Sequence, residues 1–121
     1  MNRHARRSDM RLFRRSDLIT HLIAADVPLD DHATLHSAVL HWYGNIEIRK
    51  PVCVGCKMTF VGGKARVGAF LLSTPVSAPD IVATSAFCAE CHEALSMNEV
   101  DAIATRVLRA LSPNGRFLDA R

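Results

Sequence analysis

FCAECH at residues 87–92 and PVCVGC at residues 51–56 are the two stretches that decide the fold of this chain. In each stretch two cysteines are separated by two residues, a spacing that lets one tight turn direct both sulfur atoms at a single ion. Gly55, inside the first pair, is expected to adopt the positive φ that such a turn often needs. Two pairs complete a closed tetrahedral site, which predicts one structural Zn²⁺ ion. The predicted ligands are Cys53, Cys56, Cys88 and Cys91.

The second pair is followed directly by His92, and Cys-x-x-Cys-His is also the attachment pattern of c-type haem. That interpretation leaves the first pair without a role, and Met97 is too close in sequence to His92 to reach the opposite face of the ring easily. A thioredoxin-like dithiol requires a cysteine pair that opens a long helix after a strand, but KMTFVGG follows the first pair. We therefore favour the zinc site, with His92 either bonded to a thiolate or replacing a cysteine as ligand.

Periodicity and turn signals divide the rest of the chain into short helices and strands. Ser96 and Glu99 form a capping box in front of an amphipathic stretch, which predicts a helix over residues 97–111. Ser16 or Asp17 is a candidate cap for a helix over 17–25, which Pro28 would end. The remaining predictions are a helix over 32–43, a helical stretch over 88–95, strands over 46–49, 67–73 and 81–87, and a hairpin turn over 60–64.

The order of these elements around the cysteines resembles the treble-clef class of zinc fingers, with zinc ribbons as the nearest relative. The resemblance covers residues 50–95 and rests on the two cysteine pairs, the intervening hairpin and the helix that the second pair begins. It implies an α+β fold, a small zinc-stapled β-hairpin core with flanking N-terminal and C-terminal helices. We expect a single zinc-binding domain over 16–121, with its finger core at 46–95. Because treble clefs serve nucleic-acid binders, adaptors and nucleases, the resemblance assigns no function.

Charge is distributed unevenly along the chain. The formal net charge is +3, but residues 1–15 alone carry +5, so the remainder is net acidic. We expect 1–15 to be a basic, flexible arm whose guanidinium groups bind phosphates or carboxylates. The partner is thus predicted to be nucleic acid or an acidic protein surface. The predicted contact residues are Arg3, Arg6, Arg7, Arg11, Arg14 and Arg15 in the arm, and Lys57, Lys64 and Arg66 in the finger.

These features favour a small, non-enzymatic zinc-binding regulatory protein that binds nucleic acid through its basic arm. The alternative is a zinc-stabilised protein-interaction adaptor or inhibitor, and either the C-terminal helix or the Leu35/Val39/Trp42 stripe is a candidate homodimer face. No general base or open metal position is evident, so we expect no catalysis. No apolar run is long enough to cross a bilayer and no export signal is visible. We therefore expect a cytoplasmic protein without a membrane partner, in which paired cysteines favour metal over disulfides.

Overall fold

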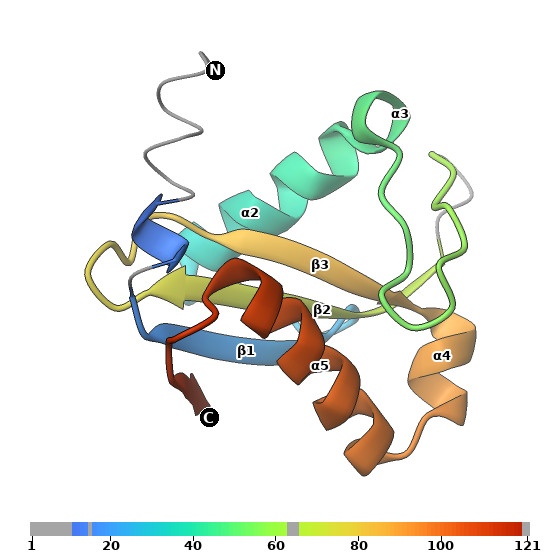
Figure 1. Ribbon diagram of the computed structural model, residues 1–121. Coiled ribbons are helices and arrows are strands. Elements are labelled where there is room, and N and C mark those ends of the chain that lie inside the picture. Colours follow the sequence, from blue (N-terminus) through green and yellow to red (C-terminus); the bar gives the residue numbers. More distant parts are fainter. Residues whose placement is uncertain (1–10, 15, 63–65, 120–121) are drawn as a thin grey trace.

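A mixed four-stranded sheet with helices on both faces forms the body of the protein (Figure 1). The computed structural model describes residues 11–14, 16–62 and 66–119. The strand order is β3-β2-β1-β4, in which β1 and β4 are parallel and the other neighbouring pairs antiparallel. The α+β class is thus confirmed, but the predicted hairpin core is part of a larger sheet. The strands are β1 (Leu18–Ala24), β2 (Val67–Pro75), β3 (Ala83–Cys88) and β4 (Phe117–Asp119).

Four labelled helices surround this sheet. They are α2 (Ala33–Gly44), α3 (Ile46–Arg49), α4 (Ala89–Ala94) and α5 (Met97–Leu111). Figure 1 shows α2 behind the sheet and α5 crossing in front of it, while α4 continues from the end of β3. Helix α5 begins with the predicted capping box, in which Ser96 and Glu99 each accept a hydrogen bond from the backbone N–H of the other. No helix among the described residues is long and apolar enough to cross a membrane.

Strand β2 is the centre of the fold because its side chains are buried on both faces of the sheet. Its sequence VGAFLLSTP is a nearly continuous apolar run, as expected of a strand that is covered on both sides. Phe70 and Leu72 belong to a hydrophobic cluster on the α2 face, where Phe70 meets Trp42 edge to face at 5.2 Å between ring centroids. Leu71 points the opposite way and packs with Leu108 of α5.

The predicted helix over 17–25 is wrong, because this segment is strand β1. Its apolar residues fit one helical stripe, yet the whole segment pairs with β2 and its first residues also pair with β4. Asp17, an expected helix cap, instead receives hydrogen bonds from the backbone and the guanidinium group of Arg116 at 2.7–3.0 Å. These partners lie far away in sequence, so local periodicity could not reveal them.

The predicted strand over 46–49 is also wrong, since α3 occupies these residues. The backbone N–H groups of Arg49 and Lys50 donate to the carbonyls of Asn45 and Ile46 at 2.8 and 2.9 Å. In a strand Ile46 and Ile48 would share one face, but Ile46 is buried and Ile48 is 79% exposed, as expected of positions i and i+2 in a helix. Over four residues a single buried position is compatible with either a helix or a strand.

The other predicted helices and strands lie close to where the sequence places them. Helices α2 and α5 occupy the predicted helical stretches, and β2 and β3 occupy two of the predicted strands. The hairpin turn predicted over 60–64 lies partly outside the described residues. Phe13, in the predicted flexible arm, is buried against Leu18 and Leu71, so the end of that arm belongs to the folded body.

Candidate metal centre

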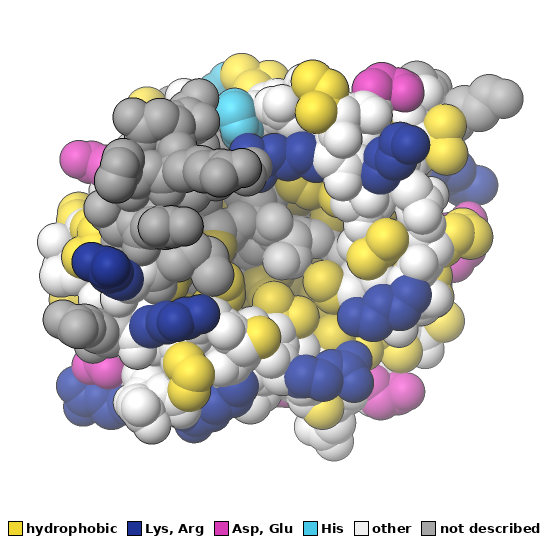
Figure 2. Space-filling model, turned by 45° about the horizontal axis from the view of Figure 1, so that its top comes forward, with side chains coloured by type: hydrophobic (Ala, Val, Ile, Leu, Met, Phe, Trp, Pro, Cys, Tyr) yellow, Lys and Arg dark blue, Asp and Glu magenta, His cyan; other side chains and the backbone are white. Residues whose placement is uncertain are grey.

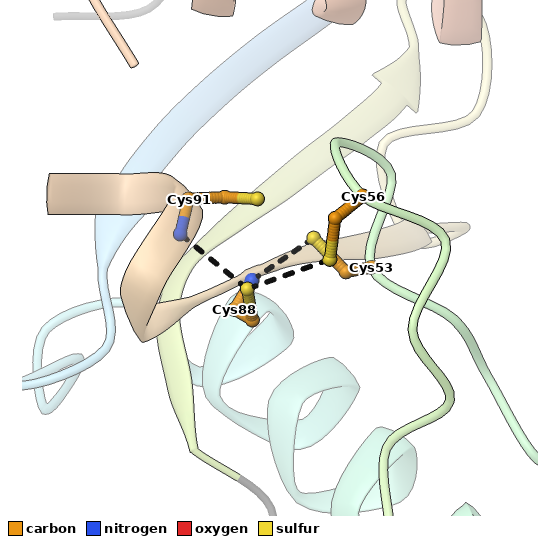
Figure 3. Close-up of side chains that lie close together, drawn as sticks. All are labelled: Cys53, Cys56, Cys88 and Cys91. Atoms are coloured by element: carbon orange, nitrogen blue, oxygen red, sulfur yellow. Dashed lines mark hydrogen bonds between the residues drawn. The ribbon is translucent and has the colours of Figure 1, made fainter. Parts of the chain in front are cut away.

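Four cysteine side chains converge between the loop after α3 and the junction of β3 with α4 (Figure 3). Their Sγ atoms all lie within 4.8 Å of one another, and those of Cys56 and Cys88 are 3.8 Å apart. In a tetrahedral site with Zn–S bonds of about 2.3 Å, neighbouring sulfurs are about 3.8 Å apart. Cys53, Cys56, Cys88 and Cys91 are therefore positioned to hold one metal ion, as the spacing predicted.

The first pair lies on a tight turn, which we call the knuckle and define as residues 51–60. The N–H of Cys53 donates to the carbonyl of Met58, and the N–H of Lys57 donates to the carbonyl of Cys53, both at 2.9 Å. Val52 and Thr59 close the turn as an antiparallel bridge. The positive φ that this turn requires, 67°, falls on Lys57 and not on Gly55. The expectation for Gly55 is thus wrong.

Gly55 serves the site through its size. A Cβ atom at this position would lie 3.0 Å from Sγ of Cys91 and 3.4 Å from its Cβ. The backbone of the knuckle therefore approaches the second cysteine pair as closely as it does only because no side chain intervenes. The N–H of Gly55 also donates to Sγ of Cys53 at 3.3 Å.

The second pair is held by the transition from strand to helix. Cys88 is the last residue of β3 and the N-cap of α4, where its Sγ accepts a hydrogen bond from the N–H of Cys91 at 3.4 Å. Cys91 then lies in the first turn of the helix. The knuckle is fastened to the same strand, because the N–H of Val54 donates to the carbonyl of Ala86 at 3.0 Å. Backbone pairing with β3 thus brings the two cysteine pairs together.

A close approach at Gly68 of β2 supports the second pair, and sequence reasoning missed it. A Cβ atom here would lie 2.4 Å from Cβ of His92, 2.9 Å from the carbonyl oxygen of Cys88 and 3.0 Å from Cα of Ala89. The β2–β3 ladder shifts register at this point, between Val67 and Ala69. A lone glycine inside an apolar strand is itself a signal of a bulge or a close backbone contact, so the pattern VGAFLL contained the clue.

The thiols of the site differ in acidity. Burial by itself raises the pKa of Cys53, but the backbone N–H groups of Cys56, Cys88 and Gly55 stabilise its thiolate and lower the pKa to about 7. Burial and the neighbouring cysteine side chains raise the pKa of Cys91, and burial also raises the pKa of Cys88. Of these three thiols Cys53 therefore ionises most readily, whereas Cys88 and Cys91 must release protons when a metal ion binds.

The site joins the hydrophobic core to the surface. Cys53 and Cys88 are 0% and 4% exposed and belong to the same buried cluster as Trp42 and Phe60. Cys56 is exposed and Cys91 is half-buried. A metal ion therefore has a path from solvent on the side of Cys56, while two of its four ligands are anchored among apolar side chains.

The other predicted site residues lie around this centre or outside the described structure. His92 is exposed on α4, and its Nδ1 and Nε2 atoms are not among the ligand atoms that converge. Lys57 is exposed on the knuckle, and Arg66 is exposed with a 3.7 Å ion pair to Glu90. Arg11 and Arg14 are exposed at the beginning of the described chain. The predicted contacts outside the described residues are Arg3, Arg6, Arg7, Arg15 and Lys64.

The centre is thus defined by a knuckle, a strand end and a helix start that bring four cysteines to one point. No protein-family model matches the sequence, and neither a curated protein nor a solved structure matches it significantly.

Proposed function

We propose that the four cysteines hold one structural Zn²⁺ ion, which joins the knuckle, the β2–β3 hairpin and α4 into a treble-clef-like unit. The observation that carries this proposal is the convergence of four Sγ atoms from two separate backbone turns. Thiolates are preferred ligands of Zn²⁺, and four of them fill its tetrahedral coordination shell. A filled shell offers no position to a substrate, so the proposed role of the ion is structural. We also propose that the protein is not an enzyme.

Elemental analysis of the purified protein tests the metal. We expect about one zinc ion per chain and no visible absorption from haem or an iron–sulfur cluster. Cys53→Ser and Cys91→Ser should each abolish stoichiometric binding, because each removes one of four ligands. Purified protein that contains iron, or protein that neither carries nor takes up zinc, would contradict the proposal.

We further propose that the protein binds nucleic acid through its basic arm and a basic knuckle face, which comprises the exposed side chains of Arg49, Lys50, Lys57 and Arg66. Lys and Arg side chains are spread over the face that carries α3 and the knuckle (Figure 2). Such groups release counterions when they contact phosphates. The ion pair between Arg66 and Glu90 is weak, because both side chains are more than 60% exposed and water screens their attraction, so Arg66 can exchange Glu90 for a phosphate.

Fluorescence anisotropy with labelled single- and double-stranded oligonucleotides at several salt concentrations tests nucleic-acid binding. We expect the affinity to fall steeply with salt, and Lys57→Glu together with Arg66→Glu to weaken binding about tenfold and to reduce the salt slope. Arg106→Glu on the exposed side of α5 is the control for a single charge reversal, to be compared with Lys57→Glu alone, and should change little. Equal effects of both changes, or no binding at about 50 mM salt, would contradict the proposal.

A second candidate function, a zinc-stabilised protein adaptor, is favoured by exposed apolar side chains on and beside the knuckle. Val52, Met58 and Val61 are 40%, 61% and 57% exposed, and a hollow next to them is lined by Phe60, Arg66 and other residues of this segment. Apolar patches with a charged rim often mark protein interfaces. Met58→Asp separates the two functions, because it should abolish an apolar protein contact and alter binding of a phosphate backbone by less than Lys57→Glu does.

A further inference from the structure

Among the residues that the structure describes, only β4 lies beside the outer edge of β1, and it covers that edge in part. Strand β4 pairs with β1 over Leu18–Thr20, and none of the described residues forms a strand beside the outer edge of His21–Ala24. Figure 1 shows the same arrangement, with β4 beside the beginning of β1 and not beside its end. Open strand edges are templates for pairing with another extended chain. This edge is therefore a candidate for strand addition.

The hydrogen-bond register shows which backbone groups the edge offers. Ala25 donates to Gly68 and Asp17 accepts from Val76, so the odd-numbered residues between Asp17 and Ala25 direct their N–H and C=O groups toward β2. Leu18 donates to Arg116, so the even-numbered residues face the other way. Leu22 and Ala24 consequently direct their backbone groups to the open edge. The carbonyl of Ala24 accepts from Val27, so within the described part of the chain the edge offers both backbone groups of Leu22 and the N–H of Ala24.

Hollows flank this edge on both faces of the sheet. On the α5 face a hollow of about 690 Å³ is lined by Leu22, Met97 and Ala104 among others. On the α2 face a second hollow, of about 320 Å³, is lined by residues that include Ile23 and Leu40. Met97 and Leu40 are 59% and 58% exposed, so these hollows present apolar surface to solvent. An added strand would direct alternate side chains toward the two hollows.

The charges around the edge select the kind of strand. Asp101 and Asp119 line the hollow on the α5 face, and Asp26 and Asp30 line the hollow on the α2 face. Among the described residues, no Lys or Arg lines either hollow. An approaching chain therefore meets apolar surfaces with acidic rims, which complement arginine or lysine and repel phosphate.

We propose that the edge of β1 at Leu22–Ala24 binds an extended, basic peptide segment of a partner protein by strand addition. Backbone hydrogen bonds to Leu22 and Ala24 supply the pairing, apolar side chains enter the hollows, and basic side chains meet the aspartates. This surface lies on other elements than the knuckle face. Its proposed partner is basic, whereas the nucleic acid proposed for the knuckle face is acidic. The inference consequently does not depend on nucleic-acid binding.

The test uses the whole chain and an eight-residue probe peptide in which pairs of valines and pairs of arginines alternate, so that each face of the added strand carries both kinds of side chain. We expect the probe to bind and to slow amide hydrogen exchange at Leu22 and Ala24, but not along β3, the opposite edge of the sheet. Asp101→Lys should weaken binding about tenfold, because it places a cation beside the bound arginines. Asp80→Lys, an equal change of charge in the loop before β3, is the matched control and should leave the affinity unchanged.

Two altered probes separate strand addition from simple charge attraction. Replacing arginine by glutamate should abolish binding, and methylating alternate backbone nitrogens that face the edge should do the same, because either change removes one of the required contacts. Equal affinity for the methylated probe overturns the proposal. So does an absence of binding up to about 1 mM peptide. Protection of the Leu22 amide that rises with protein concentration, without peptide, would assign the edge to a second copy and would also overturn it.

Discussion

The two ends of the sheet are held together by different forces. At one end, which we call the metal end, the knuckle and α4 meet at the four cysteines. Helix α4 has six residues, none of them buried. At the other, which we call the helix end, the second half of the fifteen-residue helix α5 packs its buried Leu108 against Leu18 and Leu71. At the metal end α4 thus buries no side chain, and the apolar contacts come from Val54 of the knuckle with Phe87 and Val100, whereas the helix end is built from the packing of α5 itself.

This difference shows what the proposed ion does for the chain. A short helix without a buried face gains too little from burial to offset the loss of conformational entropy. Cys53 and Cys88 anchor the cysteine site in the hydrophobic core, because both are buried in the cluster that contains Trp42. The four metal–sulfur bonds of the proposed site would order the knuckle and α4 together. The helix end needs no such bond.

Removing the metal should have the largest effect and should break the metal end first. We expect a chelator, or Cys53→Ser, to lower the free energy of unfolding by about 4 kcal/mol or more, since binding energy at such sites is folding energy. Hydrogen exchange should show loss of protection in the knuckle and α4 before α5. A metal-free protein that melts at the temperature of the zinc form, or that loses α5 first, would contradict this.

Leu108→Ala tests the helix end in the opposite way. Leu108 is 4% exposed and packs with Leu18 and Leu71, so the truncation leaves a cavity that costs about 2–4 kcal/mol. Zinc affinity should stay the same, because none of these residues touches a cysteine of the site. Denaturant unfolding gives the first quantity and competition with a zinc-binding dye the second. A parallel fall in zinc affinity would show that the two ends are coupled.

The same contrast explains how far sequence could predict this molecule. The cysteine spacing and the capping box of Ser96 and Glu99 are local signals, and the metal cluster and α5 lie where they predicted. Strand β1 was predicted as a helix because the apolar residues of LITHLIA recur at helical spacing, and its pairing with β2 and β4 overrides that local pattern. Strand β4, which sequence did not predict, is three residues long and depends on the same non-local pairing.

Within the metal site, too, local features were predictable from the sequence and non-local contacts were not. That Cys53 and Cys88 would be close was predictable from their motifs, but the role of Gly68 was not, because its neighbours, Cys88, Ala89 and His92, come from another element. The positive φ was predicted for Gly55 but occurs at Lys57, because the hydrogen bonds of the knuckle require it there. Motifs therefore specified the ligands, while tertiary contacts specified their geometry.

Gly68→Ala sharpens the comparison with a smaller effect. The new methyl group would lie 2.4 Å from Cβ of His92 and 2.9 Å from the carbonyl oxygen of Cys88, so α4 must shift. We expect a loss of about 1–3 kcal/mol of stability and a 10- to 100-fold fall in zinc affinity. Gly44→Ala at the end of α2 is the matched control, because no atom lies within 4 Å of its added Cβ. Equal losses in both variants would refute the close-contact explanation.

As the pH falls, the structure of the metal end should change first and that of the helix end should change last and least. Side-chain and backbone hydrogen bonds from Arg116 lower the pKa of Asp17 below its ordinary value of 3.8. The folded state therefore binds fewer protons there, so this contribution to stability is complete above pH 3.8 and is lost as the pH falls through the lower folded pKa. Metal release requires protons on the thiolates and should already occur at higher pH. In a pH titration followed by NMR, we expect the knuckle amides to change first and those of β4 last. Asp17→Asn should remove only the later step, and its loss of stability should be small because the ion pair is exposed.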